Sequence, residues 1–529
     1  MKAKGRVRSR FSLYHIVIVS CLTLFSRVLG FLRDVLFVKL LGARSASFIS
    51  DAFLTAFRIP QVVYEILLGG ALGAALIPVL TTVLYRDGER GAHRLMTALF
   101  IIISCITLII SGFIIYGAPS IIWFIAPGFV GEQQLLAARL LRIMIFFIVI
   151  SAVSLLFSEA VRCIQSFVVP ALSQIIYNIT FIGGLCWFAA SQASIEFLAW
   201  CVIAGGFVQC MVQLIQYLQL FAFELPSRST LTDVWQVMRR IVPSILSAGI
   251  AEMSFFIELQ FASYLPAGSI SLLSYASSFM RLPLGIFVYA LTTVIFPDMV
   301  RLSAYAPRRL AFILYEGVKI LLWVLIPVMM LMGVYSYDIF ATLYYGHPLI
   351  SVHGVTLQWL LIIKLLSLPF LAVSKMCVDA LYAIHKTRVP SIIFFGGTCV
   401  NIVANYMLMS RYGIYGIAVS AGIVAAIRTL FFIVLIDKYI HVRRYGSRLR
   451  DFLSKIAVQL LCIGTPIGIL LWIIRFILRI NLHYIFFAEQ LGLWFWVGPL
   501  CFLAAGIMWS TRHYFGIKMY FFRHRSRLP

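Results

Sequence analysis

The sequence predicts an all-α, polytopic membrane protein with about 14 transmembrane helices. Of its 529 residues, 62% are hydrophobic and only 12% are charged, and the mean hydropathy is +0.99. Apolar runs long enough to cross a bilayer, about 18 residues or more, recur from one end of the chain to the other. The composition and the recurrence of these runs together exclude a soluble multidomain protein.

The predicted helices begin directly after a basic N-terminal stretch. The first apolar segment is too long for the h-region of a cleavable signal peptide, so we expect it to be retained. Each segment can cross the hydrocarbon core at a rise of about 1.5 Å per residue. In chain order the segments are Phe11–Leu41, Phe48–Tyr85, Leu95–Ile125, Leu136–Ile164, Val169–Ala190, Phe197–Phe223, Ile241–Leu265, Ser269–Val300, Leu310–Leu343, Leu357–Ile384, Pro390–Met409, Gly413–Ile440, Phe452–Ile477 and Leu491–Trp509.

The distribution of Lys and Arg predicts the orientation in the membrane. The net charge is +24, and the positive-inside rule accounts for most of it if both termini are cytoplasmic. The basic clusters at 86–94, 228–240, 301–309, 386–388, 438–450 and 512–527 then all lie inside. Outer turns keep little beyond Arg44, Arg139, Arg411 and Arg479. A nucleic-acid partner is therefore not needed to explain the charge.

Residues for metal binding or covalent catalysis are not arranged in recognisable motifs. The ten cysteines are scattered singly without C-x-x-C spacing, which predicts neither a metal site nor a disulfide framework. The chain has no G-x-S-x-G, Walker A or H-E-x-x-H motif, and most of its nine histidines fall in loops or tails. We expect a protein that is not an enzyme and that draws on an ion gradient, the membrane potential or the gradient of its substrate.

An internal repeat predicts two related bundles. The second helix of each six-helix block has an Arg-x-Pro step and an apolar run ending at another proline, with Arg58, Pro60 and Pro78 in one block and Arg281, Pro283 and Pro297 in the other. Transporters are often built from paired bundles with the substrate site between them. We therefore divide the chain into an N-terminal bundle (1–224), a cytoplasmic linker or interfacial helix (225–240), a second bundle (241–445) and a C-terminal helix pair with a basic tail (446–529).

Ionisable residues interrupt the first two helices. A charge at mid-bilayer costs roughly 2.5 to 3.5 kcal/mol, so such a residue normally faces protein or a water-filled cavity. For Arg27 and Arg58 the depth in the helix favours an internal, hydrated and net-cationic cavity, whereas Arg33 and Lys39 lie near a helix end and could instead snorkel to the interface. Spacings of seven residues place two sets on nearly one helix face each, namely Arg27 with Asp34, and Asp51 with Arg58 and Glu65.

A second polar group lies in the predicted seventh and eleventh helices. Glu258 follows Glu252 in an apolar run, and Asn401 and Asn405 are four residues apart on one helix face. A carboxylate oxygen and two amide oxygens suit a monovalent cation or a proton-coupled carboxylate. Hydrogen bonding between helices by the asparagines is the alternative.

Opposite charges three or four residues apart predict neutralisation within single helices. The sequence has no acidic residue three or four positions from Arg281, and the place of Arg281 in the repeat corresponds to that of Arg58, so we expect it in the cavity. The three pairs are Glu159 with Arg162, Glu316 with Lys319, and Lys375 with Asp379.

These features resemble those of the MurJ/MviN family, the lipid II flippases within the MOP exporter superfamily. The resemblance spans essentially the whole chain and rests on the order and spacing of five segments: SRVLGFLRD (Ser26–Asp34), DAFLTAFRIP (Asp51–Pro60), PALSQIIYNI (Pro170–Ile179), the run Gly268–Phe287 and ALYAIHKTRVP (Ala380–Pro390). It implies a fourteen-helix, monomeric, multi-pass protein of the bacterial cytoplasmic (inner) membrane. It also implies alternating access that carries lipid II, a polyprenyl-diphosphate-linked peptidoglycan precursor, to the outer leaflet for cell-wall synthesis.

The resemblance implies roles for individual residues. Arg27, Arg33 and Asp51 match charged cavity residues that engage the pyrophosphate and headgroup of lipid II in the family. Arg58 matches a basic residue two positions before a proline. An arginine fork binds phosphate oxygens bidentately, which suits this role. The groove between the last two helices is implied to hold the polyprenyl tail.

The chain departs from the family pattern at three places. Tyr64-Glu65 stands where many members have a basic pair, and Gly69-Gly70 stands in place of Glu-Gly, so Arg58 is expected to serve for the pair. In the eighth helix Ala276-Ser277-Ser278 replaces Ala-Asp-Arg, and Arg281, one turn later, is expected to replace the missing arginine.

A coupling ion is implied as well. Glu258, Asn401 and Asn405 resemble a sodium site of some family members, although an aspartate is found there in place of Asn405. Na+, H+ or the membrane potential are therefore the expected energy sources.

Two other transport functions are alternatives. Export of another polyprenyl-linked oligosaccharide would use a similar cavity. Ion-coupled export of cationic drugs would predict a net-acidic cavity, whereas the first two helices lean basic. A membrane enzyme acting on polyprenyl phosphates would require an Asp-rich or His-containing motif in a cytoplasmic loop, and those loops carry mainly Arg and Lys.

Overall fold

The computed structural model describes residues 13–42, 47–68, 71–164, 166–191, 193–344, 348–440, 445–470, 473 and 486–517. The regular elements within these ranges are all helices, as predicted. Ten helices in the described part of the chain are long and apolar enough to cross a membrane. The fold is thus that of a multi-pass membrane protein, and the count of fourteen stays a prediction. Contacts divide the chain into two compact units, Met1–Ser271 (unit 1) and Leu272–Pro529 (unit 2).

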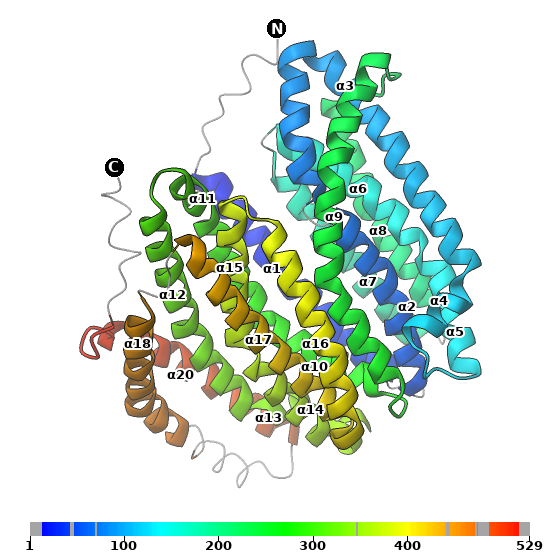
Figure 1. Cartoon of the computed structure of the whole chain (residues 1–529). Helices are drawn as coiled ribbons and strands as arrows, with labels where there is room; N and C mark the ends of the chain where they lie inside the picture. Colours follow the sequence, from blue (N-terminus) through cyan, green and yellow to red (C-terminus); the bar gives the residue numbers. More distant parts are fainter. Residues whose placement is uncertain are drawn as a thin grey trace. The chain divides into compact units, whose positions relative to one another are not determined.

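Unit 1 is a helical bundle. Helix α6 packs against α3, α8 and α2, and α7 packs against α1 and α8. Figure 1 shows α9 running beside α3. The helices are α1 (Leu13–Gly42), α2 (Ser47–Leu68), α3 (Ala71–Tyr116), α4 (Ala118–Ile125), α5 (Glu132–Met144), α6 (Phe146–Cys163), α7 (Val168–Ala190), α8 (Ile195–Leu220) and α9 (Arg228–Ser263).

The second predicted helix differs from the structure in its extent. Where one helix was expected over Phe48–Tyr85, α2 ends at Leu68 and α3 begins at Ala71, and Gly69 and Gly70 lie outside the described residues. Helix α3 then turns sharply at Gly88, whose φ of 72° is in the left-handed region that glycine adopts without a steric penalty. The basic stretch 86–94 therefore forms the bend between the two arms of α3.

Helix α9 joins two predicted elements. The linker expected at 225–240 and the span expected at Ile241–Leu265 form one helix of 36 residues. Ser227 and Thr230 start it with a reciprocal capping box, which satisfies backbone donors that a helix start leaves free. Helix α9 packs against α3 and α2 of unit 1. The domain boundaries expected from the sequence stay a prediction.

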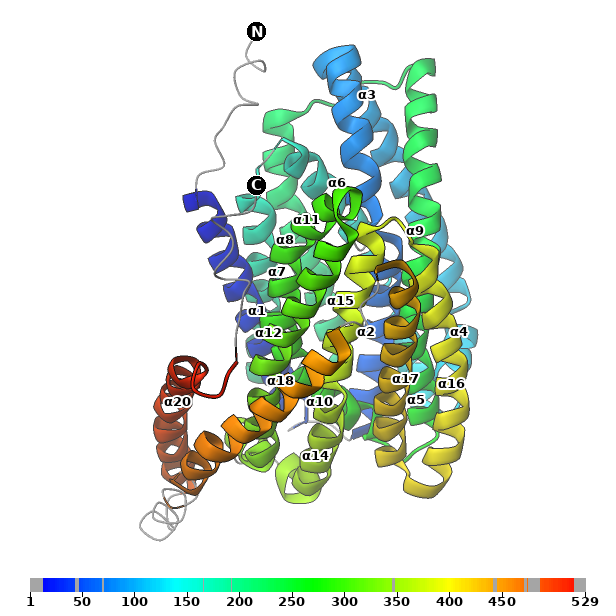
Figure 2. The ribbon, with the colours of Figure 1, turned by 60° about the vertical axis from the view of Figure 1, so that its left-hand side comes forward.

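Unit 2 is a second helical bundle. Helix α15 packs against α11, α12 and α17, and α16 and α17 lie side by side (Figure 2). The elements are α10 (Ser269–Pro283), which starts at the end of unit 1, the π-helix η1 (Leu284–Tyr289), α11 (Ala290–Tyr305), α12 (Pro307–Val334), α13 (Ser336–Leu343), α14 (Pro348–Leu366), α15 (Leu368–Ala383), α16 (Arg388–Tyr412), α17 (Ile414–Ile440), α18 (Gly446–Gln459), the π-helix η3 (Leu460–Gly464) and α20 (Phe486–Thr511).

A proline explains the break in the predicted helix Ser269–Val300. Pro283 ends α10, and the π-helix η1 follows it directly. Proline lacks the N–H group that would continue the i to i−4 ladder, so the local register changes.

A polar side chain fastens the C-terminal helices to α12. Gln459 is fully buried, and its Nε2 donates to the carbonyl oxygen of Met508 at 2.7 Å. The indole Nε1 of Trp323 donates to Oε1 of Gln459 at 3.1 Å. Such bonds act as interhelical links where lipid offers no partners. The rest of the predicted helix Phe452–Ile477 beyond 473 lies outside the described residues, so the predicted tail groove does too.

Candidate functional site

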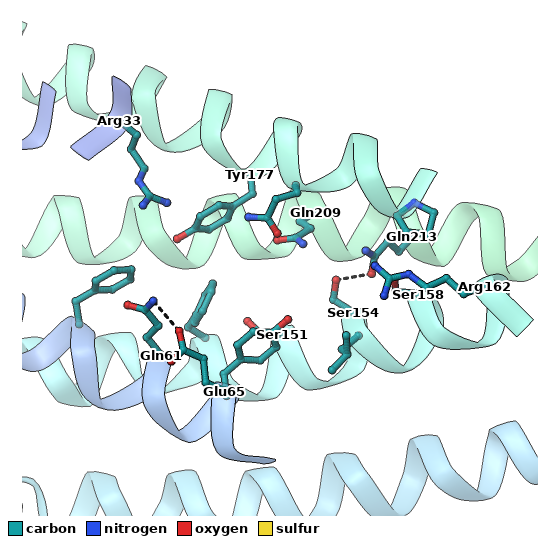
Figure 3. A pocket seen from close by; sticks show the side chains of 16 residues that line it. Arg33, Gln61, Glu65, Ser151, Ser154, Ser158, Arg162, Tyr177, Gln209 and Gln213 are labelled. Atoms are coloured by element: carbon teal, nitrogen blue, oxygen red, sulfur yellow. Dashed lines mark hydrogen bonds between the residues drawn. The ribbon is translucent and has the colours of Figure 1, made fainter. Parts of the chain in front are cut away.

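Unit 1 encloses a polar cavity of about 280 Å³. A cavity of this size has room for several ordered waters. Figure 3 shows Arg33 at one end and Arg162 at the other, with hydroxyl and amide side chains between them. The lining residues come from α1, α2, α6, α7 and α8 and are Arg33, Phe57, Gln61, Tyr64, Glu65, Phe147, Ser151, Ser154, Leu155, Ser158, Arg162, Pro170, Gln174, Tyr177, Gln209 and Gln213.

Neutral polar side chains make up much of the wall. Ser151, Ser154 and Ser158 fall on one face of α6. Ser154 Oγ donates to Oε1 of Gln213 at 2.6 Å, and Nε2 of Gln213 donates to Oγ of Ser173 at 2.7 Å. These bonds tie α6, α7 and α8 together and leave a wall that suits water or a hydroxyl-rich ligand.

Two adjacent glycines of α8 pack closely against two aromatic residues of this wall. A Cβ atom on Gly205 would lie 3.1 Å from Tyr177, and one on Gly206 would lie 3.0 Å from Phe147. Small residues let membrane helices approach closely, since packing rather than a hydrophobic driving force holds them together in lipid. The sequence of α8 therefore fixes the positions of both rings.

Arg33 is held from two sides. Its Nη2 and Nε donate to Oδ1 of Asp34 at 2.7 and 3.0 Å, and its Nη1 donates to Oδ1 of Asn178 on α7 at 3.1 Å. The guanidinium carbon lies 5.8 Å from the ring centroids of both Tyr177 and Phe181. Arg33 lines the cavity of unit 1, and its role in substrate binding stays a prediction.

Arg58 belongs to α2 and faces α9. Its Nη2 is 3.4 Å from Oε2 of Glu252 and 3.8 Å from Oε2 of Glu65. Its guanidinium carbon is 3.8 Å from the ring centroid of Phe255. Arg58 does not belong to the lining of the 280 Å³ cavity, but its partner Glu65 does.

Asp51 caps the N-terminus of α10. Its carboxylate accepts hydrogen bonds from the backbone N–H groups of Gly268 (2.6 Å) and Ser271 (2.8 Å) and from the hydroxyl of Ser271 (2.5 Å). A carboxylate at a helix N-terminus is favoured by the free donors and by the helix dipole. Asp51 is buried and borders a separate cavity of about 240 Å³, and its predicted role in substrate binding stays a prediction.

Arg27 and Arg281 lie outside the 280 Å³ cavity. Arg27 is exposed on α1. Arg281 is exposed on α10, and its Nη2 donates to Oγ of Ser278 at 2.8 Å. Their predicted part in a substrate site stays a prediction.

The predicted ion-coupling residues fall in both units. Glu258 is half-buried on α9 of unit 1. In unit 2, Asn401 and Asn405 are buried, Nδ2 of Asn405 donates to Oδ1 of Asn401, and the hydroxyl of Ser420 donates to Oδ1 of Asn405. Both amide oxygens therefore already accept hydrogen bonds. Within the described ranges no three acidic, cysteine or histidine side chains are grouped so that they could hold a metal.

The three intrahelical ion pairs predicted from the sequence are confirmed. Their nitrogen to oxygen distances are 2.7 Å for Arg162 with Glu159, 2.7 Å for Lys319 with Glu316 and 2.6 Å for Lys375 with Asp379.

Sequence reasoning missed the neutral part of the cavity wall. The signal was present, because Ser151, Ser154 and Ser158 share one face of α6 and Gln209 and Gln213 are four residues apart on α8. Polar residues without charge insert into membranes at modest cost, so they draw less attention than arginines.

Comparison with known proteins gives a consistent result. The family model described as Lipid II flippase MurJ matches residues 37–489. The chain is 26% identical over 466 residues to the lipid II flippase MurJ of Burkholderia cenocepacia, covering 84% of this chain and 88% of that protein.

Solved structures match over a similar extent. The lipid II flippase MurJ in an inward closed conformation has a TM-score of 0.72 at 23% identity, covering 86% of this chain and 92% of that chain. An inward-facing multidrug resistance MATE family transporter of the MOP superfamily has a TM-score of 0.65 at 15% identity, covering 81% and 99%. At these identities the likeness concerns the fold alone.

Proposed function

The chain belongs to the lipid II flippase MurJ family, and on this premise we propose that it moves lipid II from the inner to the outer leaflet of the bacterial cytoplasmic membrane by alternating access. The observation that carries the proposal is the match of the family model over residues 37–489. The fold adds support, because a bundle with a polar interior can shield a hydrophilic headgroup while the lipid tail stays in the bilayer.

Arginines are the proposed partners of the diphosphate. Arg33 and Arg58 present guanidinium groups inside unit 1, and the arginine fork fits phosphate oxygens. Arg27 and Arg281 are assigned to the same anion-binding role on the basis of their match to the family pattern and the repeat. Asp51 acts as a positioning residue, since it holds the start of α10.

The protein transports lipid II without a chemical step. The protein acts as a monomer with both termini in the cytoplasm, and its partners are lipid II and membrane lipids rather than nucleic acid. The basic clusters that face the cytoplasm in this orientation account for most of the net charge of +24.

The membrane potential is the proposed driving force. An interior-negative potential favours outward movement of an anionic headgroup by about 2.3 kcal/mol per charge and per 100 mV. Coupling to Na+ or H+ at Glu258, Asn401 and Asn405 is the alternative predicted from the sequence. In that case each amide oxygen would bind the cation while it accepts the hydrogen bond that the structure shows.

Replacement of a cell's only lipid II flippase by this chain tests the proposal. We expect the parent chain to sustain growth and outer-leaflet exposure of labelled lipid II, and Arg33→Ala and Arg58→Ala to fail at matched membrane levels. Arg139→Ala is the matched control, because Arg139 is on α5 with a side chain that is 61% exposed and pairs only loosely with Glu196 at 3.8 Å.

The possible outcomes test lipid II transport separately from the roles of Arg33 and Arg58. No rescue by a properly inserted parent chain would contradict lipid II transport and favour another polyprenyl-linked substrate. Rescue by all four chains would keep the function and remove the proposed roles of Arg33 and Arg58.

A further inference from the structure

Arg58 connects two helices of unit 1 through two carboxylates. Glu65 belongs to α2 and Glu252 to α9, and both approach the same nitrogen, Nη2. Phe255, also on α9, stacks on the guanidinium at 3.8 Å. The guanidinium is thereby paired with two carboxylates and covered by an aromatic ring inside the bundle, which lowers the cost of the cation in the membrane.

The contacts of Arg58 are loose for an ion pair. Charge-assisted N–H to O bonds are usually about 2.7 to 2.9 Å long, whereas the two separations here are 3.4 and 3.8 Å. Nε of Arg58 is buried and has no acceptor among the described residues. In contrast, Arg33 holds Asp34 at 2.7 Å. The fork of Arg58 therefore has donor capacity that a ligand with several acceptor oxygens can use.

Glu65 connects this cluster to the polar cavity. It lines the cavity, and its Oε1 accepts a hydrogen bond of 3.0 Å from Nε2 of Gln61, as Figure 3 shows. A cavity of about 280 Å³ with hydroxyl and amide walls suits water. Glu65 thus borders a space that can hold water, although it lies within a membrane helix.

The other charged and titratable groups near Glu65 are accounted for helix by helix. Arg33 of α1 has Asp34, and Arg162 of α6 has Glu159 as ion-pair partner. Helix α9 presents Glu252 to the shared arginine, while α3 and α5 contribute none of the described residues that line the cavity. The remaining titratable groups in the lining are Tyr64 of α2 and Tyr177 of α7.

We propose that Glu65 is a proton-binding site linked to the binding of a diphosphate-bearing lipid at Arg58. This inference rests on the proposed function, in which Arg58 binds the diphosphate. When the diphosphate engages Arg58, Glu65 loses its counter-charge and gains an anionic neighbour. One of its carboxylate oxygens then takes a proton from cavity water, and the complex carries one more proton than the free protein.

The linkage has a definite sign. The bound state holds more protons than the free state, so affinity for the diphosphate rises as pH falls. Full coupling of one proton corresponds to at most about a tenfold change in affinity per pH unit. The release of Glu65 from Arg58 also loosens one link of the α2 and α9 cluster in the step that takes up substrate.

Binding of farnesyl diphosphate to the purified full chain between pH 8 and pH 6 tests the proposal. The dissociation constant and the protons taken up per ligand are measured by calorimetry in buffers of different ionisation enthalpy. We expect proton uptake and about a threefold to tenfold gain in affinity per pH unit for the parent chain, and a clearly weaker pH dependence for Glu65→Gln. The ligand's own titration is common to both proteins and cancels in the comparison.

Two further variants make the test decisive. Glu132→Gln changes an exposed carboxylate on α5 in the same way and is expected to behave like the parent. Equal pH dependence in the parent and Glu65→Gln, or loss of the pH dependence in Glu252→Gln but not in Glu65→Gln, would overturn the assignment to Glu65 while leaving the anion site intact. No binding of farnesyl diphosphate above that of farnesol would overturn the anion site and the inference with it. Thermal unfolding of each variant shows that it is folded.

Discussion

Asn178 links two helices through one buried side chain. Its Oδ1 accepts from Nη1 of Arg33, and its Nδ2 donates to the carbonyl oxygen of Ser26, both at 3.1 Å. Both partners belong to α1. The amide therefore fixes the position of α1 along the axis of α7, and it also fixes the direction of the guanidinium. Arg33 belongs to α1, but its side chain is directed toward the cavity by the hydrogen bond to Asn178 of α7.

Asn178→Ala is expected to lower both stability and transport. The change removes two hydrogen bonds and leaves Nη1 of Arg33 without its Asn178 acceptor, which costs about 1 to 3 kcal/mol in total. The midpoint of thermal unfolding in detergent and exposure of lipid II in proteoliposomes check this. Thr180→Ala is the control, because it removes only a bond to Ile176 within α7. Equal loss in both variants would contradict the special role of Asn178.

At the level of residues, the depth of a charge in its helix did not identify the cavity lining. Depth favoured Arg27 and Arg58 for a cavity and left Arg33 open to snorkelling, whereas the lining contains Arg33 and Glu65 but neither Arg27 nor Arg58. The task of Asp51 was not predictable from its place in α2, because its donors, Gly268 and Ser271, are more than two hundred residues away in the sequence. Such a partner is set by tertiary packing, which helical periodicity does not report.

At the level of elements, α8 depends on its two adjacent glycines. Gly205→Leu would push its side chain against Tyr177, which a Cβ atom alone would approach to 3.1 Å. We expect a strain of about 1 to 3 kcal/mol, a lower thermal midpoint and reduced lipid II transport, since Tyr177 would move in the cavity wall.

Gly183→Leu provides a matched control for this substitution. Gly183 is exposed on α7, and a Cβ atom there would meet nothing within 4 Å. If Gly183→Leu and Gly205→Leu had equal effects, the loss would come from the leucine in the membrane rather than from the packing of α8.

The asparagine pair joins α16 to α17 without a charge. Asn401, Asn405 and Ser420 form a buried chain of hydrogen bonds. We expect replacement of Na+ by choline to leave transport and thermal stability unchanged in the parent. Asn405→Asp adds a buried carboxylate, so its stability is expected to fall in choline and to recover in Na+.

Thermal unfolding in matched choline and Na+ buffers distinguishes the two cases. A Na+-dependent rise in the midpoint of the parent would contradict a neutral, self-satisfied cluster and restore the coupling role predicted for these asparagines.

Hydropathy predicts where helices lie but not where they begin, end or bend. The apolar runs located the helices correctly in broad terms, but a run cannot report where its backbone breaks. Gly88 turns α3 within a polar stretch, and Pro283 introduces a π-helix. Helix α9 runs without a break from the segment expected to be a linker or an interfacial helix into the next predicted span. Each outcome depends on local backbone geometry and packing rather than on average polarity.

At the level of the whole molecule, the driving force is open to a direct test. An interior-negative potential set with K+ and valinomycin is expected to shift lipid II toward the outer leaflet of oriented proteoliposomes. Each charge moved across 100 mV contributes about 2.3 kcal/mol, or roughly a 50-fold change in the equilibrium ratio. The same leaflet distribution with and without the potential would exclude net charge movement during transport.

The capping of α10 by Asp51 has a consequence for biosynthesis. The carboxylate enters the membrane with α2, yet the donor of Ser271 is made 220 residues later. At synthesis rates of about 5 to 20 residues per second, this interval lasts roughly 10 to 40 s. During that time the Asp51 carboxylate lacks the donors of Gly268 and Ser271 that satisfy it in the finished protein. A chain truncated before Gly268 therefore never gains these hydrogen bonds.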